Sequence, residues 1–274
     1  MSDLFYHYTD FQALDGILRC AQLRVNNVLR MNDSAEMRHF MIRLSSAIVK
    51  RLEKAGEPHQ ARAVGELFQA ELREEYSAFA ACFSFRRDDA AQWERYGNRG
   101  RGVCIAFRGD LLRQMAVGPL SLHTVFYEDD MTGHPMVDRF CELARSKEKL
   151  SGEDLDVRRA MRDAWACSVA FKHPSFSSED EVRLVVAPFG SEAFDMKPCY
   201  HVTKERIKKY YPLDLKDMCR KAGAELEDLV VEIVIGPEST QSRIMLQDYL
   251  YDQDLGALAW RVSLSDCPLR GLST

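Results

Sequence analysis

The most constraining feature of this sequence is a succession of short apolar segments, rich in β-branched and aromatic residues, that alternate with segments of helical spacing. The strand-like segments are LFYHYT, QLRVNN, SAFAACFSF, GVCIAF, LHTVFY, EVRLVVAP, LVVEIVIGP and WRVSL. Helical spacing is found at about residues 10–18, 34–75, 88–97, 135–170, 214–223 and 238–251, with a break near Gly56 and Pro58. This mixture predicts an α+β fold in which a central or split sheet is flanked by helices.

Composition limits the classes of protein to which the chain can belong. Its 274 residues, 46% of them hydrophobic, can bury a sizeable core. A net charge of -5 argues against a protein that coats nucleic acid. No apolar run reaches the roughly 18 residues of a membrane span, and the N-terminus does not read as a signal peptide, so we expect a cytoplasmic protein without a membrane partner. The eight cysteines include no closely spaced zinc-type pair, and we interpret them as reduced, structural thiols.

A histidine stands between two tyrosines in the opening strand. Alternation along LFYHYT places Phe5, His7 and Thr9 on one face and Tyr6 and Tyr8 on the other. The residues that follow cap a helix. A lone histidine in a strand is usually a satisfied core or rim group, so a functional role for His7 requires matching chemistry from other parts of the chain.

A polar turn follows the second strand in LRVNNVLRMNDSAE. Asn32, Asp33 and Ser34 lie at its centre, and helix capping explains Asp33 adequately. Arg24 and Arg30 flank the turn and are less well explained by capping, since both can contact an anion. The turn therefore has two interpretations, a helix cap or part of a binding site.

An aromatic pair surrounded by arginines follows the third strand in CFSFRRDDAAQWERYGNRGRG. Trp93 and Tyr96 are three residues apart and would share one helix face. Such a pair beside arginines can stack on a planar ring and hold a phosphate. Alternatively, the two rings are the buried face of a short helix with solvated arginines around it.

Charged residues gather at the start of the strand in AFKHPSFSSEDEVRLVVAP. Alternation places Glu179, Glu181 and Arg183 on one face, and Lys172 lies shortly before them. Charges buried there cost solvation unless they bind each other or a ligand. The alternatives are an exposed edge strand or a site in which a carboxylate anchors a sugar hydroxyl and stabilises an oxocarbenium ion.

A further polar run, KERIKKYYP, interleaves lysines with tyrosines between Lys204 and Pro212. Such a run can contact a polyanion. In an acidic chain we favour a solvated surface.

These pieces occur in an order that resembles a bacterial family described only as a domain of unknown function. The matching motifs are HYTDFQALDGIL, LRVNNVLRMNDSAE, CFSF, WERYG, GVCIAF, the segment from Lys172 to Arg183, and VEIVIGP, and together they cover most of the chain. That family in turn resembles the ADP-ribosyltransferase fold. The resemblance implies one domain over residues 1–274 with an ADP-ribosyltransferase-like split sheet and helical insertions at about 34–75 and about 135–170.

The resemblance also implies roles for individual residues. In the similar enzymes a first-strand histidine binds the ribose of NAD, a tyrosine stacks on nicotinamide, and a later glutamate assists cleavage of the glycosidic bond. These roles fall here to His7, Tyr96 and Glu181, with Glu179 orienting the substrate; Tyr8 or Tyr127 are alternatives for the tyrosine. The expected cofactor-binding residues are Tyr8, Thr9, Arg24, Asn32, Ser84, Trp93 and Arg183. The sequence departs from the family at Ser178, where an aromatic is expected, and at Val182, where a tryptophan is expected.

The resemblance therefore implies an NAD-binding, ADP-ribosyltransferase-like enzyme that needs no metal. It would transfer ADP-ribose to a protein, a nucleic acid or a small molecule, or hydrolyse NAD, in a role that suits a toxin or an anti-phage defence factor. The alternative is a non-catalytic module that binds a nucleotide or nucleic acid. The first interpretation requires His7, a tyrosine ring and Glu181 to line one cleft.

Overall fold

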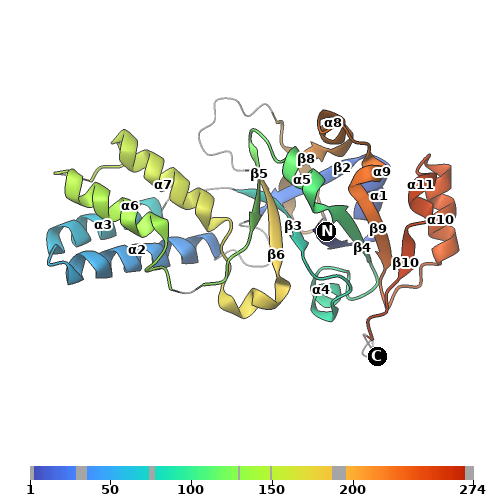
Figure 1. Cartoon of the computed structure of the whole chain (residues 1–274), viewed down its shortest axis with the longest axis horizontal. Coiled ribbons are helices and arrows are strands. Elements are labelled where there is room, and N and C mark those ends of the chain that lie inside the picture. Colours follow the sequence, from blue (N-terminus) through green and yellow to red (C-terminus); the bar gives the residue numbers. More distant parts are fainter. Residues whose placement is uncertain are drawn as a thin grey trace.

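The computed structural model describes residues 3–28, 36–73, 78–128, 130–148, 150–186 and 196–268. Its strands are β1 Leu4–Thr9, β2 Gln22–Asn27, β3 Phe79–Ser84, β4 Val103–Arg108, β5 Leu120–Thr124, β6 Glu181–Val186, β7 Cys199–Val202, β8 Ile207–Asp214, β9 Val230–Ile235 and β10 Val262–Leu264. They form a sheet in the order β10-β9-β4-β1-β3-β2-β8-β7, with β6 paired to β3 and β5 paired to β6. The pair β9–β10 is parallel, whereas the other pairs among these strands are antiparallel. The predicted α+β class, a large sheet with flanking helices, is confirmed (Figure 1).

The helices begin and end largely where residue spacing and caps place them. They are α1 Phe11–Leu18, α2 Glu36–Lys54, α3 Pro58–Glu71, α4 Ala90–Arg95, α5 Gly109–Met115, α6 Pro135–Ser146, α7 Leu155–Ser168, the 3-10 helix η2 Pro174–Glu179, α8 Leu215–Lys221, α9 Leu226–Leu229, α10 Arg243–Asp252 and α11 Gly256–Ala259. The predicted break between α2 and α3 is confirmed. The predicted helix from residue 238 begins instead at Arg243, because the Ser242 side chain caps it by accepting from the backbone of Met245.

The sheet is divided at β3. One edge of β3 pairs with β6 over its whole length, from Phe79 to Ser84. On the other edge, Ser84 pairs with β1 and the first two residues, Phe79 and Ala80, pair with β2. The stretch of β3 between these contacts therefore has neither β1 nor β2 as a ladder partner. Because α1 connects β1 to β2 across this gap, the two strands diverge and leave an opening between them.

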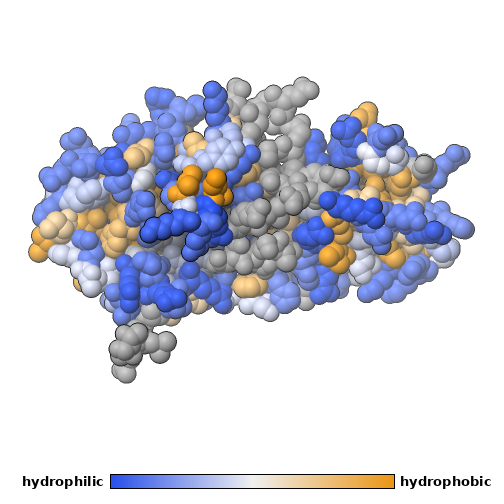
Figure 2. All heavy atoms as spheres, turned by 180° about the vertical axis from the view of Figure 1, so that it is seen from behind, coloured by the Kyte–Doolittle hydropathy of each residue, from blue (hydrophilic) through white to orange (hydrophobic). Residues whose placement is uncertain are grey.

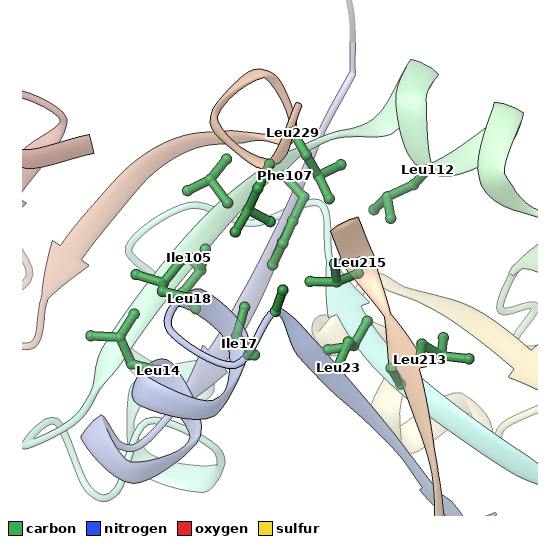
Figure 3. Close-up of a cluster of buried hydrophobic side chains, with 14 of the residues drawn as sticks. Leu14, Ile17, Leu18, Leu23, Ile105, Phe107, Leu112, Leu213, Leu215 and Leu229 are labelled. Atoms are coloured by element: carbon green, nitrogen blue, oxygen red, sulfur yellow. The ribbon is translucent and has the colours of Figure 1, made fainter. Parts of the chain in front are cut away.

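Helix α1 covers the apolar face of the sheet beside this opening. Its buried residues, Leu14, Ile17 and Leu18, follow helical spacing and face Ile105 and Phe107 of β4 (Figure 3). Residues from β2, β8, α5, α8 and α9 complete the cluster. Burial of this apolar area fixes α1, and with it the two strands that border the opening.

A second apolar cluster joins the helices α2, α3, α6 and α7 at one end of the molecule (Figure 1). Phe40, Phe68, Phe140 and Trp165 are buried within it. The cluster continues into the sheet through Ala80 of β3 and Val185 of β6. The two stretches predicted as helical insertions therefore pack together and against the opposite face of β3 and β6 from α1.

Two glycines allow the ends of β1, β4 and β9 to approach closely. A Cβ on Gly102 would overlap the carbonyl oxygen of Thr9, and a Cβ on Gly236 would overlap that of Gly100. The backbone of Gly236 instead donates to Gly102, at 2.9 Å. This contact fixes the loop that leads from α4 to β4, and so it supports the position of α4.

On the face turned away from Figure 1, apolar side chains form small separate patches among polar ones (Figure 2). Within the described ranges, no helix combines the length and apolar character needed to cross a bilayer.

Candidate functional site

A cavity of about 480 Å³ lies at the opening between β1 and β2. Its walls come from β1, α1, β2, β3, α4, η2, β6 and the β7–β8 hairpin. Most of the residues predicted for the site line it, namely His7, Tyr8, Thr9, Arg24, Ser84, Tyr96, Glu179, Glu181 and Arg183. Segments nearly two hundred residues apart in the sequence thus meet at one cavity.

One end of the cavity holds four buried charged side chains, Lys172, Glu179, Glu181 and Arg183. Lys172 bridges the two carboxylates, since its Nζ lies 2.5 Å from Glu179 Oε2 and 3.2 Å from Glu181 Oε2. Arg183 binds Glu181 through both Nε and Nη2, at 2.9 and 3.2 Å. The predicted charges are therefore buried, and they bind each other rather than lying on an exposed edge strand.

The carboxyl of Glu181 is held in its ionised form. Burial raises its pKa and is the largest single effect, but the charges of Arg183 and Lys172 and the hydrogen bonds from Arg183 outweigh it and hold the pKa at about 2. The phenol of Tyr127 accepts from the backbone of Glu181 at 2.9 Å, and burial raises the pKa of Tyr127 to about 12. Glu181 is thus a permanent anion beside a neutral phenol near pH 7.

Glu179 is placed by the turn that connects η2 to β6. Asp180, in the left-handed region with φ 47°, ends η2 and sends the chain into β6. The Glu179 carbonyl accepts from the Ser84 hydroxyl at 2.6 Å and from the Gln92 amide at 3.0 Å. Ser84 therefore holds the backbone that carries the carboxylate. The predicted alternation across Glu179, Glu181 and Arg183 is interrupted here, since β6 begins at Glu181.

Helix α4 brings two side chains onto the carboxylate of Glu179. The Tyr96 phenol donates to Glu179 Oε1 at 3.0 Å, and Arg95 Nη1 lies 2.6 Å from the same oxygen. Burial, aided by the two glutamates, raises the pKa of Tyr96. Tyr96 is therefore a neutral hydrogen-bond donor to Glu179 at this end of the cavity.

His7 replaces the missing ladder partner of β3. Its Nδ1 lies 2.8 Å from the carbonyl oxygen of Cys82, so Nδ1 carries the proton. Burial lowers the pKa of His7 and favours the neutral ring, in which Nε2 is an acceptor. By alternation and register His7 projects to the Phe83 side of the sheet, opposite to Glu181 and Cys82, and it reaches the shared cavity at the gap.

The predicted cofactor-binding residue Trp93 has other surroundings. Trp93 is fully buried against Tyr8 and is not a lining residue of the cavity; its Nε1 donates to Asp88 at 2.7 Å. Tyr96 is the C-cap of α4 and packs against the same apolar cluster as Trp93, which favours the interpretation of the two rings as the buried face of a short helix. Asn32, Asp33, Ser34 and Arg30 lie outside the described residues.

The Tyr8 side chain lines the cavity, and its hydrogen bonds also support α4. Its hydroxyl donates to the carbonyl of Arg86 at 2.8 Å and accepts from the backbone of Asp89 at 3.0 Å. Asp89 in turn caps α4. Tyr8 therefore connects the first strand to the helix that carries Tyr96.

The other end of the cavity is cationic, and its residues on the β7–β8 hairpin were not predicted as part of the site. Arg24 of β2 lies with its guanidinium carbon 4.9 Å from the ring centroid of Tyr210. His201, Arg206 and Lys208 also line this end. The signal available in the sequence is KERIKKYYP, for which the acidic composition of the whole chain favours a solvated surface.

Comparison with known proteins gives a match to one family model over part of the chain, and no activity. Residues 92–184 match the family model described as "Protein of unknown function (DUF2971)". No curated protein and no solved structure matches the chain. The matched range includes α4, η2 and most of β6, and with them Tyr96, Lys172 and the two glutamates. Among the described residues, no group of three or more histidine, cysteine or acidic side chains is placed to hold a metal ion.

Proposed function

We propose that the cavity binds NAD and that the chain is an ADP-ribosyltransferase-like enzyme. It would cleave the bond between nicotinamide and ribose and transfer ADP-ribose to an acceptor or to water. The observation that carries the proposal is that a neutral histidine, a neutral tyrosine and a buried, ionised glutamate border one cavity whose other end is cationic.

The acidic end suits the ribose and its glycosidic bond. The lone pair on His7 Nε2 can accept a hydrogen bond from a ribose hydroxyl. Glycosidic cleavage develops positive charge on the sugar, and a fixed carboxylate such as that of Glu181 stabilises this charge without having to lose a proton first. Tyr96, whose hydroxyl donates to Glu179 and which lines the same cavity, would offer an aromatic surface to the nicotinamide.

The cationic end suits the diphosphate. Arg24, Arg206 and Lys208 supply positive charge and hydrogen-bond donors at the end of the cavity away from the glutamates. A cavity of about 480 Å³ also lies within the range of roughly 300–1,000 Å³ found for small-molecule and cofactor sites. One end therefore holds carboxylates that are paired with cations, and the other holds cations without a carboxylate partner among the described residues, so the second end is the better site for the diphosphate.

The reaction needs no reactant other than NAD and the acceptor. The bond between the ribose carbon and the nicotinamide nitrogen breaks, and its electron pair leaves with nicotinamide as a neutral base. The acceptor forms a new bond to the same carbon and loses a proton. With water as acceptor, the products are nicotinamide, ADP-ribose and a proton.

The proposal is tested by NAD binding and nicotinamide release with the purified protein and with His7→Ala and Glu181→Gln. We expect Glu181→Gln to reduce turnover by about 100-fold, the usual loss when one electrostatic group at a reacting centre is removed. Because Glu181 is buried, its folding is checked by circular dichroism and by the melting temperature. Arg24→Ala gives a second readout, since it weakens NAD binding while the acidic end stays intact.

His59→Ala and Glu66→Gln on α3 are matched controls, because both residues are exposed and remote from the cavity lining. Loss of turnover in the controls would show a general effect on folding. A folded wild-type protein that neither binds NAD nor releases nicotinamide would overturn the proposal.

The second candidate is a non-catalytic nucleotide- or nucleic-acid-binding module. The observation in its favour is that both carboxylates already have cationic partners, Lys172, Arg95 and Arg183. The acidic pair would then be structural and the cavity would be cationic overall. Binding of adenine nucleotides that Glu181→Gln does not weaken, without turnover, would favour this candidate.

A further inference from the structure

The β7–β8 hairpin differs in charge from the rest of the molecule. Residues 196–211 contain five lysines or arginines and one glutamate, a net charge of +4, whereas the whole chain has a net charge of -5. The hairpin extends beyond its neighbour, because β8 pairs with β2 over Tyr210 to Asp214 and pairs with β7 over Ile207 to Tyr210. The hairpin that carries the excess positive charge therefore extends past the residues of β8 that pair with β2.

The cations of this hairpin lack carboxylate partners among the described residues. No ion pair joins Lys197, Lys204, Arg206, Lys208 or Lys209 to an acidic side chain there. Elsewhere on the surface, arginines commonly have such partners: Arg62 binds Glu66 and Arg220 binds Asp217. With respect to the described residues, the hairpin cations are therefore available to an anion from outside the chain.

The two faces of the hairpin have different chemistry. His201 and Lys208 are opposite one another in the register, and both line the cavity. On the other face, Tyr200 is opposite Lys209, and Val202 is opposite Ile207. Lys209 also borders the cavity, and its Nζ lies 5.6 Å from the ring centroid of Tyr211. Tyr200 is 60% exposed. An exposed aromatic ring on a cationic hairpin is the combination by which proteins bind single-stranded nucleic acid, with bases stacked on the ring and phosphates near the cations.

We propose that the β7–β8 hairpin binds single-stranded nucleic acid and directs it toward the cavity. Continuity with the cavity favours this partner over an anionic membrane, because a flexible strand can follow Lys208 and His201 inward whereas a bilayer surface cannot. The role of the strand as the ADP-ribose acceptor rests on the proposed function; its binding to the hairpin does not.

The test measures binding of a fluorescent single strand of about 16 nucleotides, as DNA and as RNA, over a range of salt concentrations. Tyr200→Ala and the double variant Lys197→Gln/Lys204→Gln are used because none of these residues lines the cavity. We expect Tyr200→Ala to weaken binding about tenfold. The double variant should reduce the salt slope by about 0.7 for each lysine removed.

Tyr251→Ala and Arg62→Gln are the matched controls, since they remove an exposed tyrosine and a paired surface cation elsewhere. Nicotinamide release is measured in parallel for every variant and should not change. Wild-type protein that releases nicotinamide but does not bind the strand would overturn the hairpin proposal and leave the proposed function in place. Strand binding by a wild-type protein that releases no nicotinamide would support the hairpin proposal and overturn the proposed function.

Binding of the protein to vesicles that contain anionic lipid is measured as the last comparison. Wild-type protein that binds these vesicles but no single strand would overturn the inference and identify the hairpin as a membrane contact. Equal binding by wild type, Tyr200→Ala and the double lysine variant would also overturn it, because the strand would then be held elsewhere.

Discussion

Lys172 is the residue on which the buried acidic pair depends most directly. It is the cation that contacts both carboxylates, whereas Arg95 contacts Glu179 and Arg183 contacts Glu181. Two carboxylates that share a cavity repel one another unless a cation lies between them. The position of Lys172, directly after an isolated bridge between Phe126 and Phe171, is therefore a requirement for the site as well as for folding.

We expect Lys172→Met to lower the free energy of unfolding by about 3–5 kcal/mol, because it leaves buried negative charge without one of its partners. Urea unfolding measures this change. Arg62→Ala, which breaks an exposed pair on α3, is the control and should cost less than about 1 kcal/mol. Equal losses in the two variants would contradict a central role for Lys172.

Because the pKa of Glu181 is lowered in the folded protein, the free energy of unfolding depends on pH in the acidic range. The pKa of Glu181 is about 2 in the folded protein, against an ordinary value of 4.5. The stabilisation is present above pH 4.5 and is lost as the pH falls toward 2, because the unfolded chain takes up the proton first; it is on the order of 3 kcal/mol. The free energy of unfolding of wild type should therefore fall more steeply between pH 6 and pH 3 than that of Glu181→Gln. Parallel curves would contradict this assignment.

At the scale of elements, the sequence predicted the strands and caps near the site better than the hairpin. The opening strand, α1 and the residues of the charged cluster could be placed because alternation and capping are local. β7 and β8 could not, because KERIKKYYP has the composition of a solvated surface and acquires its strand pairing from β2. Trp93 was misplaced for a related reason, since the length of α4 depends on the turn at Gly97 and on packing against Tyr8.

The close contact at the ends of β4 and β9 gives a prediction for glycine substitutions. Gly236→Ala should destabilise the protein by about 3 kcal/mol, because the added methyl group would overlap the Gly100 carbonyl. Gly65→Ala in α3 is the matched substitution; its methyl group meets nothing within 4 Å, so it should stabilise by about 0.5–1 kcal/mol. Thermal unfolding of both variants tests the pair, and effects of the same sign would contradict the close-contact argument.

At the scale of the molecule, the helical cluster packs against the sheet through a small number of apolar residues. Ala80 and Val185 belong to the same cluster as the buried residues of α2, α3, α6 and α7. Trp165 reports on that cluster, whereas Trp93 reports on the packing beside β1. The helices therefore lose part of their buried surface if the sheet unfolds.

We expect the two regions to unfold in one cooperative transition. Urea unfolding of Trp165→Phe and of Trp93→Phe is followed by fluorescence and by far-ultraviolet circular dichroism. The midpoints of the two variants should differ only by the change in stability that each substitution causes. In each variant, the two signals should give the same midpoint. An earlier transition seen by Trp165 alone would show that the helical cluster unfolds independently.

The order of strands has a consequence for synthesis on the ribosome. β1 is made first, but it lies between β3 and β4, and β2 lies between β3 and the much later β8. The cationic end of the cavity therefore stays absent until residues beyond Tyr210 have left the ribosome. Contacts this distant along the chain slow folding. A nascent chain that ends before β8 would hold the acidic cluster but not the cations opposite it, so the cavity is among the last parts of the protein to form.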